Sequence, residues 1–438
     1  MIVRGATVLT MEEEGEVLRD VDILIEDGRI ARVAPEIAPG KHAVLDARGL
    51  VAVPGFVQTH THLCQTLFRN QADDLSLLEW LRERIWPFEA AHDESSIEAS
   101  AELGLAELLL GGTTTILDMG TVRHTDVIFQ AARRAGIRAW IGKCHMDVDA
   151  GQPRALFEDA KTSLAEADEI CRRWNGAEGG RLGYAFAPRF VISCTEGLLR
   201  DVHALACETS ALVHTHASES LEECRLVRQR TGKDNVEYLH SIGLTRAGLV
   251  LAHCVHVTDD EITLLTESRT GVSHCPSSNL KLASGIARVD EMLAAGVSVG
   301  LGADGAPCNN NLDMFREMRL AALIHKPRLG PRALPASRVL EMATVDGALS
   351  LACPTAFGRL APGNAADIAL LDLDSDVSTV PGDDLAARIV YSAGRECVRH
   401  VIVDGRIVVR DRRLLTLDVE RARARAVEEI AKVRRRIA

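Results

Sequence analysis

The chain has 438 residues, of which 47% are hydrophobic and 26% are charged, and its formal net charge is −12. This composition is typical of a globular protein and excludes collagen, coiled coil and intrinsic disorder. A nucleic-acid-binding protein usually carries a surplus of basic residues, because phosphate contacts dominate its affinity, so the acidic balance predicts no nucleic acid partner.

The beginning of the sequence lacks the basic and apolar segments of a signal peptide, and no apolar stretch reaches the roughly 18 residues of a membrane span. The 11 cysteines include no C-x-x-C pair. We therefore expect a reduced, cytoplasmic protein that contacts no membrane. We also expect it to form a homo-oligomer, a dimer or larger.

Two β-hairpins are predicted, one near each end of the chain. In each, two short apolar runs flank an Asp-Gly pair, at residues 27–28 and 404–405, and Asp-Gly strongly favours a two-residue hairpin turn. Residues 366–371 form a further apolar run. Strand-rich ends around a long middle predict one small composite β-sandwich, built from residues 1–55 and 361–438 and including a C-terminal helix.

The middle of the chain alternates short apolar runs with helical patterns. The runs are 51–59, 113–119, 138–146, 182–190, 211–216, 249–255, 271–275 and 297–303. Eight strand candidates that alternate with helices are typical of an α/β fold with a parallel barrel. We therefore predict a (β/α)₈ TIM barrel over residues 56–360.

Several of these runs end in residues that bind metals or transfer protons. They are His60 and His62 in the first run, His214 and His216 in the fifth, His253 in the sixth and Asp304 after the eighth. Because strand ends converge at one mouth of such a barrel, three imidazoles and one carboxylate can meet there. Such a set suits a divalent metal with one position left for water. The spacing alone leaves open whether His214 or His216 is the ligand.

Each of these residues also has a structural interpretation when it is taken alone. Two histidines two residues apart are common on an edge strand, and Asp304-Gly305 by itself predicts a turn. The ordered set favours the metal site over these readings, because independent placement would not put a histidine or carboxylate at four strand ends.

The ordered set resembles the amidohydrolase superfamily, and specifically its aminohydrolase branch, over almost the whole sequence. Further segments carry the resemblance. They are 54–62 (PGFVQTHTH), 111–115 (GGTTT), 274–280 (HCPSSNL) and 358–367 (GRLAPGNAAD). The resemblance implies a hydrolase that acts on C–N bonds of cyclic amidines and releases ammonia.

The resemblance also implies a role for each residue of the set. The expected metal ligands are His60, His62, His216 and Asp304; Glu219 is the expected proton shuttle, and His253 lies beside the hydrolytic water. The H-x-x-E spacing of this branch selects His216 rather than His214 as the ligand. In the binuclear branch a lysine on strand four bridges two metals, and the fourth run ends in APRF without a lysine. One divalent metal is therefore expected, Zn²⁺ before Fe²⁺.

Two patterns compete for the substrate. Gln65 and Arg189-Phe190 resemble the base-binding residues of guanine deaminases, whereas Trp80 and Glu89 resemble the lid of deaminases of 5′-deoxyadenosine, methylthioadenosine and S-adenosylhomocysteine. In adenosylhomocysteine deaminases a histidine usually stands at the position of Arg189. Trp80 and Phe190 could equally be core residues, and Arg189 could form a structural ion pair.

We expect an amino-substituted purine or its nucleoside as the substrate, with 5′-deoxyadenosine-type nucleosides ranked above guanine and related bases. A third reading is an s-triazine hydrolase, because these enzymes share H-x-H-x-x-Q. A metal-free scaffold would have lost ligands, and this sequence retains all of them. The sequence leaves open whether Lys143, His145 and Asn309–Asn311 line the pocket.

Overall fold

The computed structural model describes residues 1–13, 15–246, 248–352 and 357–437. Its centre is a closed barrel of eight parallel strands in the order β11-β12-β13-β14-β6-β7-β8-β10, closed by the pairing of β10 with β11. The strands are β6 (Phe56–Thr61), β7 (Thr113–Met119), β8 (Arg138–Gly142), β10 (Leu182–Pro188), β11 (Leu212–Ala217), β12 (Leu249–His253), β13 (Gly271–His274) and β14 (Val299–Leu301). Each of the eight predicted apolar runs overlaps one of them, so the TIM barrel is confirmed.

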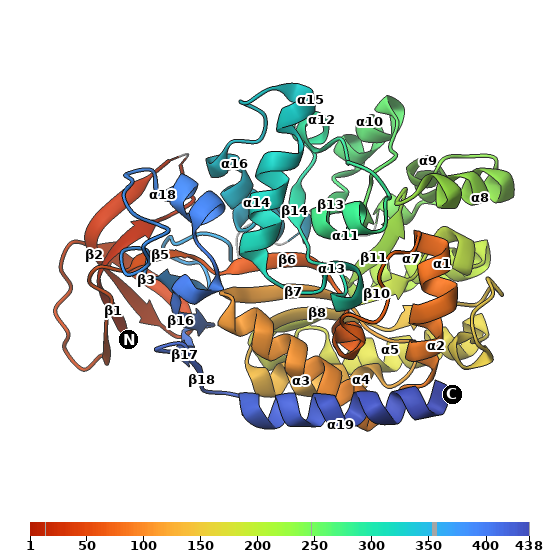
Figure 1. Ribbon diagram of the computed structural model, residues 1–438, viewed down its shortest axis with the longest axis horizontal. Helices are drawn as coiled ribbons and strands as arrows, with labels where there is room; N and C mark the ends of the chain where they lie inside the picture. The colour runs from red at the N-terminus through yellow and green to blue at the C-terminus, as the bar shows by residue number, and fades with distance from the viewer. Residues whose placement is uncertain (14, 247, 353–356, 438) are drawn as a thin grey trace.

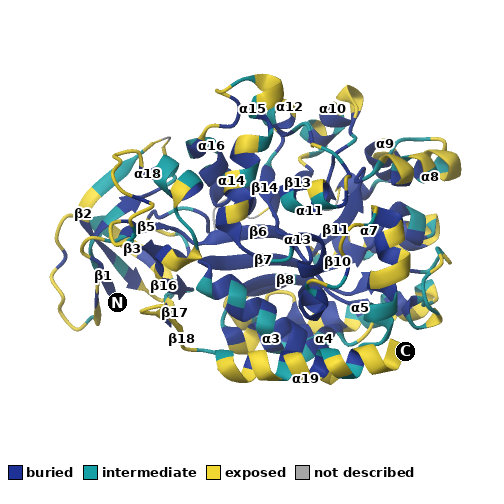
Figure 2. Ribbon diagram, in the orientation of Figure 1, coloured by how far each residue is buried: buried dark blue, intermediate teal, exposed yellow. Residues whose placement is uncertain are grey.

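Helices surround the barrel (Figure 1). The longer ones are α3 (Glu94–Leu110), α4 (Thr125–Ala135), α5 (Ala160–Trp174), α7 (Glu196–Thr209), α8 (Leu221–Thr231), α10 (Asp259–Ser268) and α14 (Met314–Ile324). Shorter ones are α1 (Leu77–Trp80), α2 (Trp86–Ala90), α9 (Asn235–Ser241), α11 (Pro276–Lys281), α12 (Val289–Ala294), α13 (Ala306–Asn309), α16 (Ala336–Met342) and α17 (Val345–Ser350). The barrel strands are buried along their length (Figure 2), as expected for a parallel sheet enclosed by helices.

Both ends of the chain contribute to a second, nine-stranded sheet. Its strands are β1 (Ile2–Leu9), β2 (Val17–Glu26), β3 (Arg29–Ala34), β4 (Val44–Asp46), β5 (Val51–Pro54), β15 (Ile368–Leu371), β16 (Val398–Val403), β17 (Arg406–Arg410) and β18 (Arg413–Leu414). The antiparallel pairing of β5 with β15 joins the two ends of the chain, and the hairpins β2–β3 and β16–β17 are confirmed. The predicted domain boundaries at residues 55 and 361 stay a prediction.

The passage from the terminal sheet into the barrel requires a glycine. Gly55 lies between β5 and β6, and a Cβ atom there would come within 2.1 Å of the side chain of Thr114 at the start of β7. Any larger residue would push β6 and β7 apart, which would displace His60 on β6 and His62 directly after it.

The C-terminal helix α19 (Val419–Ile437) lies along the outside of the barrel against α3 (Figure 1). Arg425 anchors it through ion pairs with Glu98 at 2.9 Å and Glu102 at 3.0 Å. Within the described ranges, no helix combines the length and the hydrophobicity that crossing a membrane requires.

Candidate active site

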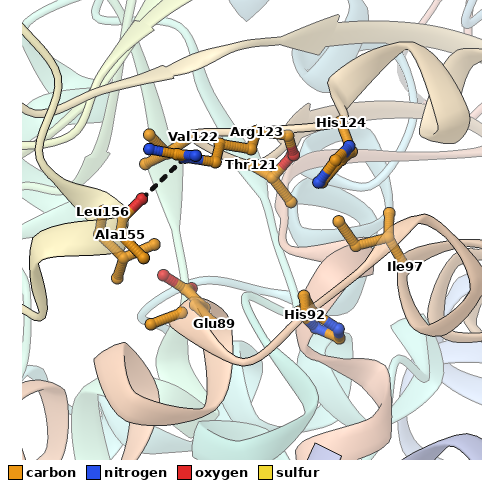
Figure 3. A pocket seen from close by; sticks show the side chains of 10 residues that line it. Glu89, His92, Ile97, Thr121, Val122, Arg123, His124, Ala155 and Leu156 are labelled. Carbon is orange, nitrogen blue, oxygen red and sulfur yellow. Dashed lines mark hydrogen bonds between the residues drawn. The ribbon is translucent and has the colours of Figure 1, made fainter.

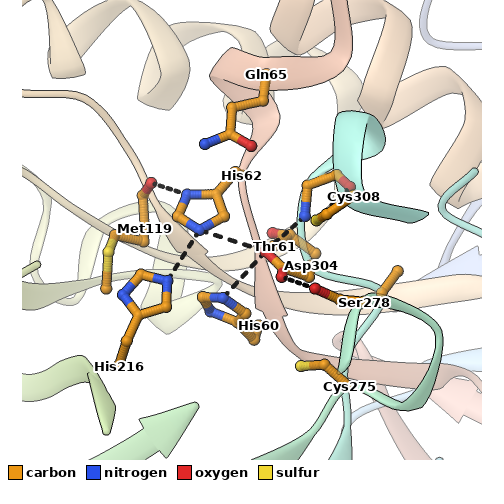
Figure 4. Close-up of polar contacts among 12 residues, drawn as sticks. His60, Thr61, His62, Gln65, Met119, His216, Cys275, Ser278, Asp304 and Cys308 are labelled. Carbon is orange, nitrogen blue, oxygen red and sulfur yellow. Dashed lines mark hydrogen bonds and ion pairs between the residues drawn. The ribbon is translucent and has the colours of Figure 1, made fainter. Parts of the chain in front are cut away.

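The chemically active residues predicted from the sequence meet at the carboxyl ends of the barrel strands (Figure 4). His60 lies on β6 and His62 directly after it, His216 lies on β11, and Asp304 lies three residues after β14. None of the four is more than 4% exposed. The Nε2 atoms of His62 and His216 are 3.3 Å apart, and Asp304 Oδ1 lies 3.3 Å from His60 Nε2 and 3.5 Å from His62 Nε2.

Backbone carbonyls orient two of the imidazoles. His62 Nδ1 is 3.1 Å from the carbonyl oxygen of Met119, and His216 Nδ1 is 2.7 Å from that of Arg189. A carbonyl oxygen only accepts hydrogen bonds, so both Nδ1 atoms carry the proton and both Nε2 atoms carry a lone pair. These lone pairs face the centre of the site.

His214 orients the third imidazole. Its Nδ1–H donates to the carbonyl oxygen of Val250 at 3.0 Å, so its Nε2 accepts the Nδ1–H of His60 at 2.7 Å. The Nε2 lone pair of His60 is thereby turned towards Asp304. His214 thus lies behind His60 while His216 reaches the centre. Sequence reasoning missed this role, although the two-residue spacing of His214 and His216 on a strand places both on one face.

Replacing His214 with asparagine is expected to weaken metal binding by about 10–100-fold, because partners that hold the far nitrogen of a ligand histidine typically contribute that much. Competition with a chelator measures the affinity. His203→Asn, on the outer helix α7, is the matched control and is expected to change nothing. Equal metal affinity in the His214 variant and the parent protein would contradict the orienting role.

Asp304 and His253 are both held by neighbours on α11. Asp304 Oδ2 accepts the Ser278 Oγ–H at 2.6 Å, and Asn279 Oδ1 accepts the His253 Nδ1–H at 2.8 Å. Both residues lie in the left-handed backbone region, with φ of +61° for Asp304 and +74° for His253. Non-glycine residues persist in that region only when the surrounding structure holds them there, and such strain concentrates at functional sites.

Glu219 follows β11 and lies close to His253 and Asp304. Its Oε2 is 3.6 Å from His253 Nε2, which in turn is 3.8 Å from Asp304 Oδ2. Burial, reinforced by the nearby Asp304 and Glu223, raises the pKa of Glu219 well above its usual range. This shift favours the protonated carboxyl group, which can act as a proton donor.

Asp304 has the opposite protonation state. Burial opposes its ionisation, but His60, His253 and His62 outweigh burial and hold the pKa of Asp304 well below its usual range. Burial also lowers the pKa of His253 to about 4. Two carboxyl groups whose environments push their pKa values apart are typical of an acid and base pair, with Glu219 as the acid.

Three of the predicted substrate-binding residues form one buried network. The carboxylate of Glu89 accepts hydrogen bonds from both terminal nitrogens of Arg189, one of them at 3.1 Å, and from Gln65 Nε2 at 2.8 Å. The side chains of Arg189 and Glu89 are 4% and 8% exposed. A Cβ at Gly305 would lie 2.1 Å from Gln65 Oε1, so the amide of Gln65 rests directly on the backbone next to Asp304.

The two predicted aromatic contacts belong to an apolar cluster beside the site. The ring of Phe190 stacks on that of His216, with centroids 4.5 Å apart and planes inclined by 18°. Trp80 is 4% exposed and packs in the same cluster, which also contains Met119 and Met146. The Nε1–H of Trp80 is buried and has no hydrogen-bond partner among the described residues.

A small cavity lies next to this network (Figure 3). Its volume is about 30 Å³, and its lining includes Glu89, His92, Arg123 and Leu156. Arg123 Nε donates to the carbonyl oxygen of Ala155 across it, at 3.0 Å. Since a water molecule needs at least roughly 10–15 Å³ measured in this way, the cavity has room for water but for no larger group in this conformation.

The sequence left open whether certain polar residues line the pocket, and in the structure their side chains form ion pairs or hydrogen bonds with other residues. Lys143 forms ion pairs with Glu158 at 2.7 Å and Glu166 at 2.9 Å, so its ammonium is neutralised away from the metal ligands. His145 Nδ1 is 2.9 Å from Ser163 Oγ. Hydrogen bonds also engage the Asn309 and Asn310 side chains: Asn309 Nδ2 donates to Ala303 O at 2.7 Å and Asn310 Nδ2 to Asn70 Oδ1 at 2.7 Å.

Comparison with known proteins gives a consistent picture. Residues 51–408 match the model of the Amidohydrolase family. A 5-methylthioadenosine/S-adenosylhomocysteine deaminase of Pelotomaculum thermopropionicum is 39% identical over 433 residues, which cover 97% of each chain. A 5′-deoxyadenosine deaminase of Methanosarcina mazei is 38% identical over 438 residues, 99% of each chain. The crystal structure of an adenosine deaminase from Xanthomonas campestris with bound zinc superposes with a TM-score of 0.93, at 30% identity, covering 99% of this chain and 98% of that one.

Proposed function

Because this chain belongs to the amidohydrolase family, we propose that it is a mononuclear metal-dependent deaminase that releases ammonia from a 5′-modified adenosine. The candidate substrates are 5′-deoxyadenosine, methylthioadenosine and S-adenosylhomocysteine, the compounds after which its relatives are named. The single observation that carries the reaction type is the grouping of Glu219, His253 and Asp304 beside three converging imidazoles.

We assign the metal ligands as His60, His62, His216 and Asp304. The atom pairs His62 Nε2–His216 Nε2, His60 Nε2–Asp304 Oδ1 and His62 Nε2–Asp304 Oδ1 are 3.3–3.5 Å apart, and atoms so rich in electrons repel one another unless a cation lies among them. His60 Nε2 is buried without a hydrogen-bond partner among the described residues, which also fits a ligand role. Histidine nitrogen and carboxylate oxygen suit zinc, so Zn²⁺ is the proposed ion, with Fe²⁺ as the alternative.

Each of these residues then has a distinct role in the proposed reaction. A divalent cation supplies acidity to water, so that hydroxide is available near neutral pH. Asp304 takes the proton of the attacking water, and His253 orients that water. Glu219 gives its proton to a nitrogen of the purine ring as hydroxide adds to the amino-bearing carbon. Glu219 then takes back a proton from the added hydroxyl group, which becomes a carbonyl group on the ring. Asp304 passes the proton that it took from water to the amino group, which departs as ammonia.

The Glu89 network favours a nucleoside over a free base. In the guanine reading Arg189 and Gln65 donate to the base, but here both already donate to Glu89. A carboxylate has about four lone-pair sites, and three of those of Glu89 accept these hydrogen bonds, so about one stays free to accept a hydroxyl group of a ribose. Trp80 would then cover the purine ring, as aromatic rings commonly do with flat ligands.

A panel of amines tests the substrate assignment by ammonia release. We expect kcat/KM for the three 5′-modified adenosines to exceed that for guanine by at least about 10-fold, since loss of the ribose removes a hydrogen bond to a charged group. Adenine, which lacks the ribose, is the matched control. A higher kcat/KM for guanine, a pterin or an aminotriazine would overturn the assignment of a nucleoside substrate. The assignment of the reaction as a deamination would stand.

We further propose that the protein works in the cytoplasm. The cysteines in the described part of the chain are free thiols, most of them buried, as is usual in a reducing compartment. The homo-oligomer expected from the sequence stays a prediction.

A further inference from the structure

Glu317 on α14 is a buried carboxyl group that the proposed reaction does not use. Its side chain is inaccessible to solvent, and burial raises its pKa to about 7. The carboxylate accepts hydrogen bonds from Ser277 N–H at 3.2 Å, Ser277 Oγ–H at 2.5 Å and Asn309 Nδ2–H at 2.9 Å. Burying a carboxylate without such partners costs free energy, so these three donors stabilise Glu317 in its buried position.

The first two donors belong to α11, the short helix after β13. Ser277 is followed by Ser278, which donates to Asp304, and by Asn279, which accepts from His253. The two residues that orient the catalytic groups therefore come immediately after the residue that Glu317 holds by both its backbone and its side chain.

The third donor belongs to α13, the short helix after Asp304. Asn309 Nδ2 donates to Glu317 and also, at 2.7 Å, to the carbonyl oxygen of Ala303, the residue before Asp304. Glu317 thus reaches Asp304 from two sides, through Ser277–Ser278 and through Asn309–Ala303. Since Asp304 has a φ of +61°, its backbone depends on such outside contacts to stay in place.

We propose that Glu317 is a positioning residue that holds Asp304 and His253 in their catalytic orientation by tying α11 to α13. The inference rests on the proposed function for the roles of Asp304 and His253. The hydrogen bonds by which Glu317 links α11 to α13 do not depend on the substrate. Glu317 touches neither residue itself, so its action passes through the hydrogen bonds of its neighbours.

The amide of glutamine cannot replace this carboxylate. Three donors point at the two oxygens of Glu317, and in Glu317→Gln one of these oxygens becomes an NH₂ group. That group would face either the Ser277 N–H or the Asn309 NH₂, so one donor pair would clash and α11 or α13 would move. The substitution conserves volume, so it tests the hydrogen bonds rather than the packing.

The test uses the full-length, zinc-loaded protein labelled with ¹⁵N-histidine. For Glu317→Gln we expect kcat to fall by about 10–100-fold, as for outer-shell partners of metal sites, with KM changed by less than about twofold and one zinc retained. The Nδ1 resonance of His253 is expected to shift, because its hydrogen bond to Asn279 lengthens. Ser277→Ala removes only the Oγ–H donor and is expected to cause a smaller change in the same direction.

Glu261→Gln is the matched control. Glu261 is also a buried carboxyl, and it accepts the backbone N–H of Val236 at 2.8 Å and of Thr258 at 2.9 Å, away from the site. We expect it to lower Tm and to leave kcat and the His253 resonance unchanged. The proposal is overturned if Glu317→Gln and Ser277→Ala lower only Tm, or if the His253 resonance stays where it was. Should the parent protein deaminate no tested substrate, the resonance still decides the positioning role, while the proposed function alone fails.

Discussion

Replacing Glu219 with glutamine is expected to lower kcat for deamination by about 10²–10⁴-fold, the contribution typical of a positioned general acid–base. Glutamine has the shape of a protonated glutamic acid but holds its amide protons too tightly to transfer one to the purine ring. Glu219 lies 3.6 Å from His253 and contacts none of the proposed metal ligands directly, so one metal ion per chain should still bind. Steady-state ammonia release, measured together with metal content, checks both expectations.

The neighbouring helix offers a matched control for this variant. Glu222 is exposed at the start of α8, three residues from Glu219, so Glu222→Gln removes a carboxylate of the same size without touching the site. We expect its kcat to equal that of the parent protein. Normal turnover by the Glu219 variant would refute its role as the proton donor. Loss of metal from that variant would instead make Glu219 part of the binding site.

Removal of the metal is expected to abolish deamination, by at least about 10³-fold, because the cation provides several kcal/mol of stabilisation to the transition state. Dialysis against a chelator, followed by metal analysis and an activity assay, measures this loss. Return of one equivalent of Zn²⁺ per chain should restore the rate, since the proposed ligands His60, His62, His216 and Asp304 form a single set. A requirement for two equivalents would contradict the mononuclear assignment.

Mg²⁺ is the control ion for this experiment. It prefers six oxygen ligands in octahedral geometry, whereas the assigned set contains three imidazoles, so Mg²⁺ should not restore the rate. If the chelated protein keeps its full activity after its metal content falls to a small fraction of one equivalent, the metal-dependent mechanism is wrong.

Much of the fold could be predicted because its signals are local. The Asp-Gly pairs at 27–28 and 404–405 favour tight turns wherever they occur, and both hairpins formed as expected. The eight apolar runs are parallel strands buried on both faces, which produces a continuous apolar pattern that is visible in the sequence. The order of such runs, alternating with helices, allows few other topologies.

The candidate site was accessible from the sequence only in part. His60 and His62 stand two residues apart at the end of one strand, and Glu219 stands three residues after His216, so short-range spacing linked each pair to a known motif. Spacing alone could not choose between His214 and His216. The family resemblance was needed to make that choice. The structure then showed that His214 accepts a hydrogen bond from His60.

The sequence by itself determined which elements form and which residues can carry the chemistry, because hydrophobic period, turn residues and short motifs act over a few neighbours. Only the tertiary structure decided how these residues support one another. The pairs His60–His214, Glu89–Arg189 and Ser277–Glu317 are 154, 100 and 40 residues apart along the chain. Their hydrogen bonds depend on the closure of the barrel, which brings strand ends together to within a few ångströms. No local pattern encodes that distance. The hydrogen-bond partners of buried groups such as Arg189 and Glu317 are therefore visible only in the folded structure.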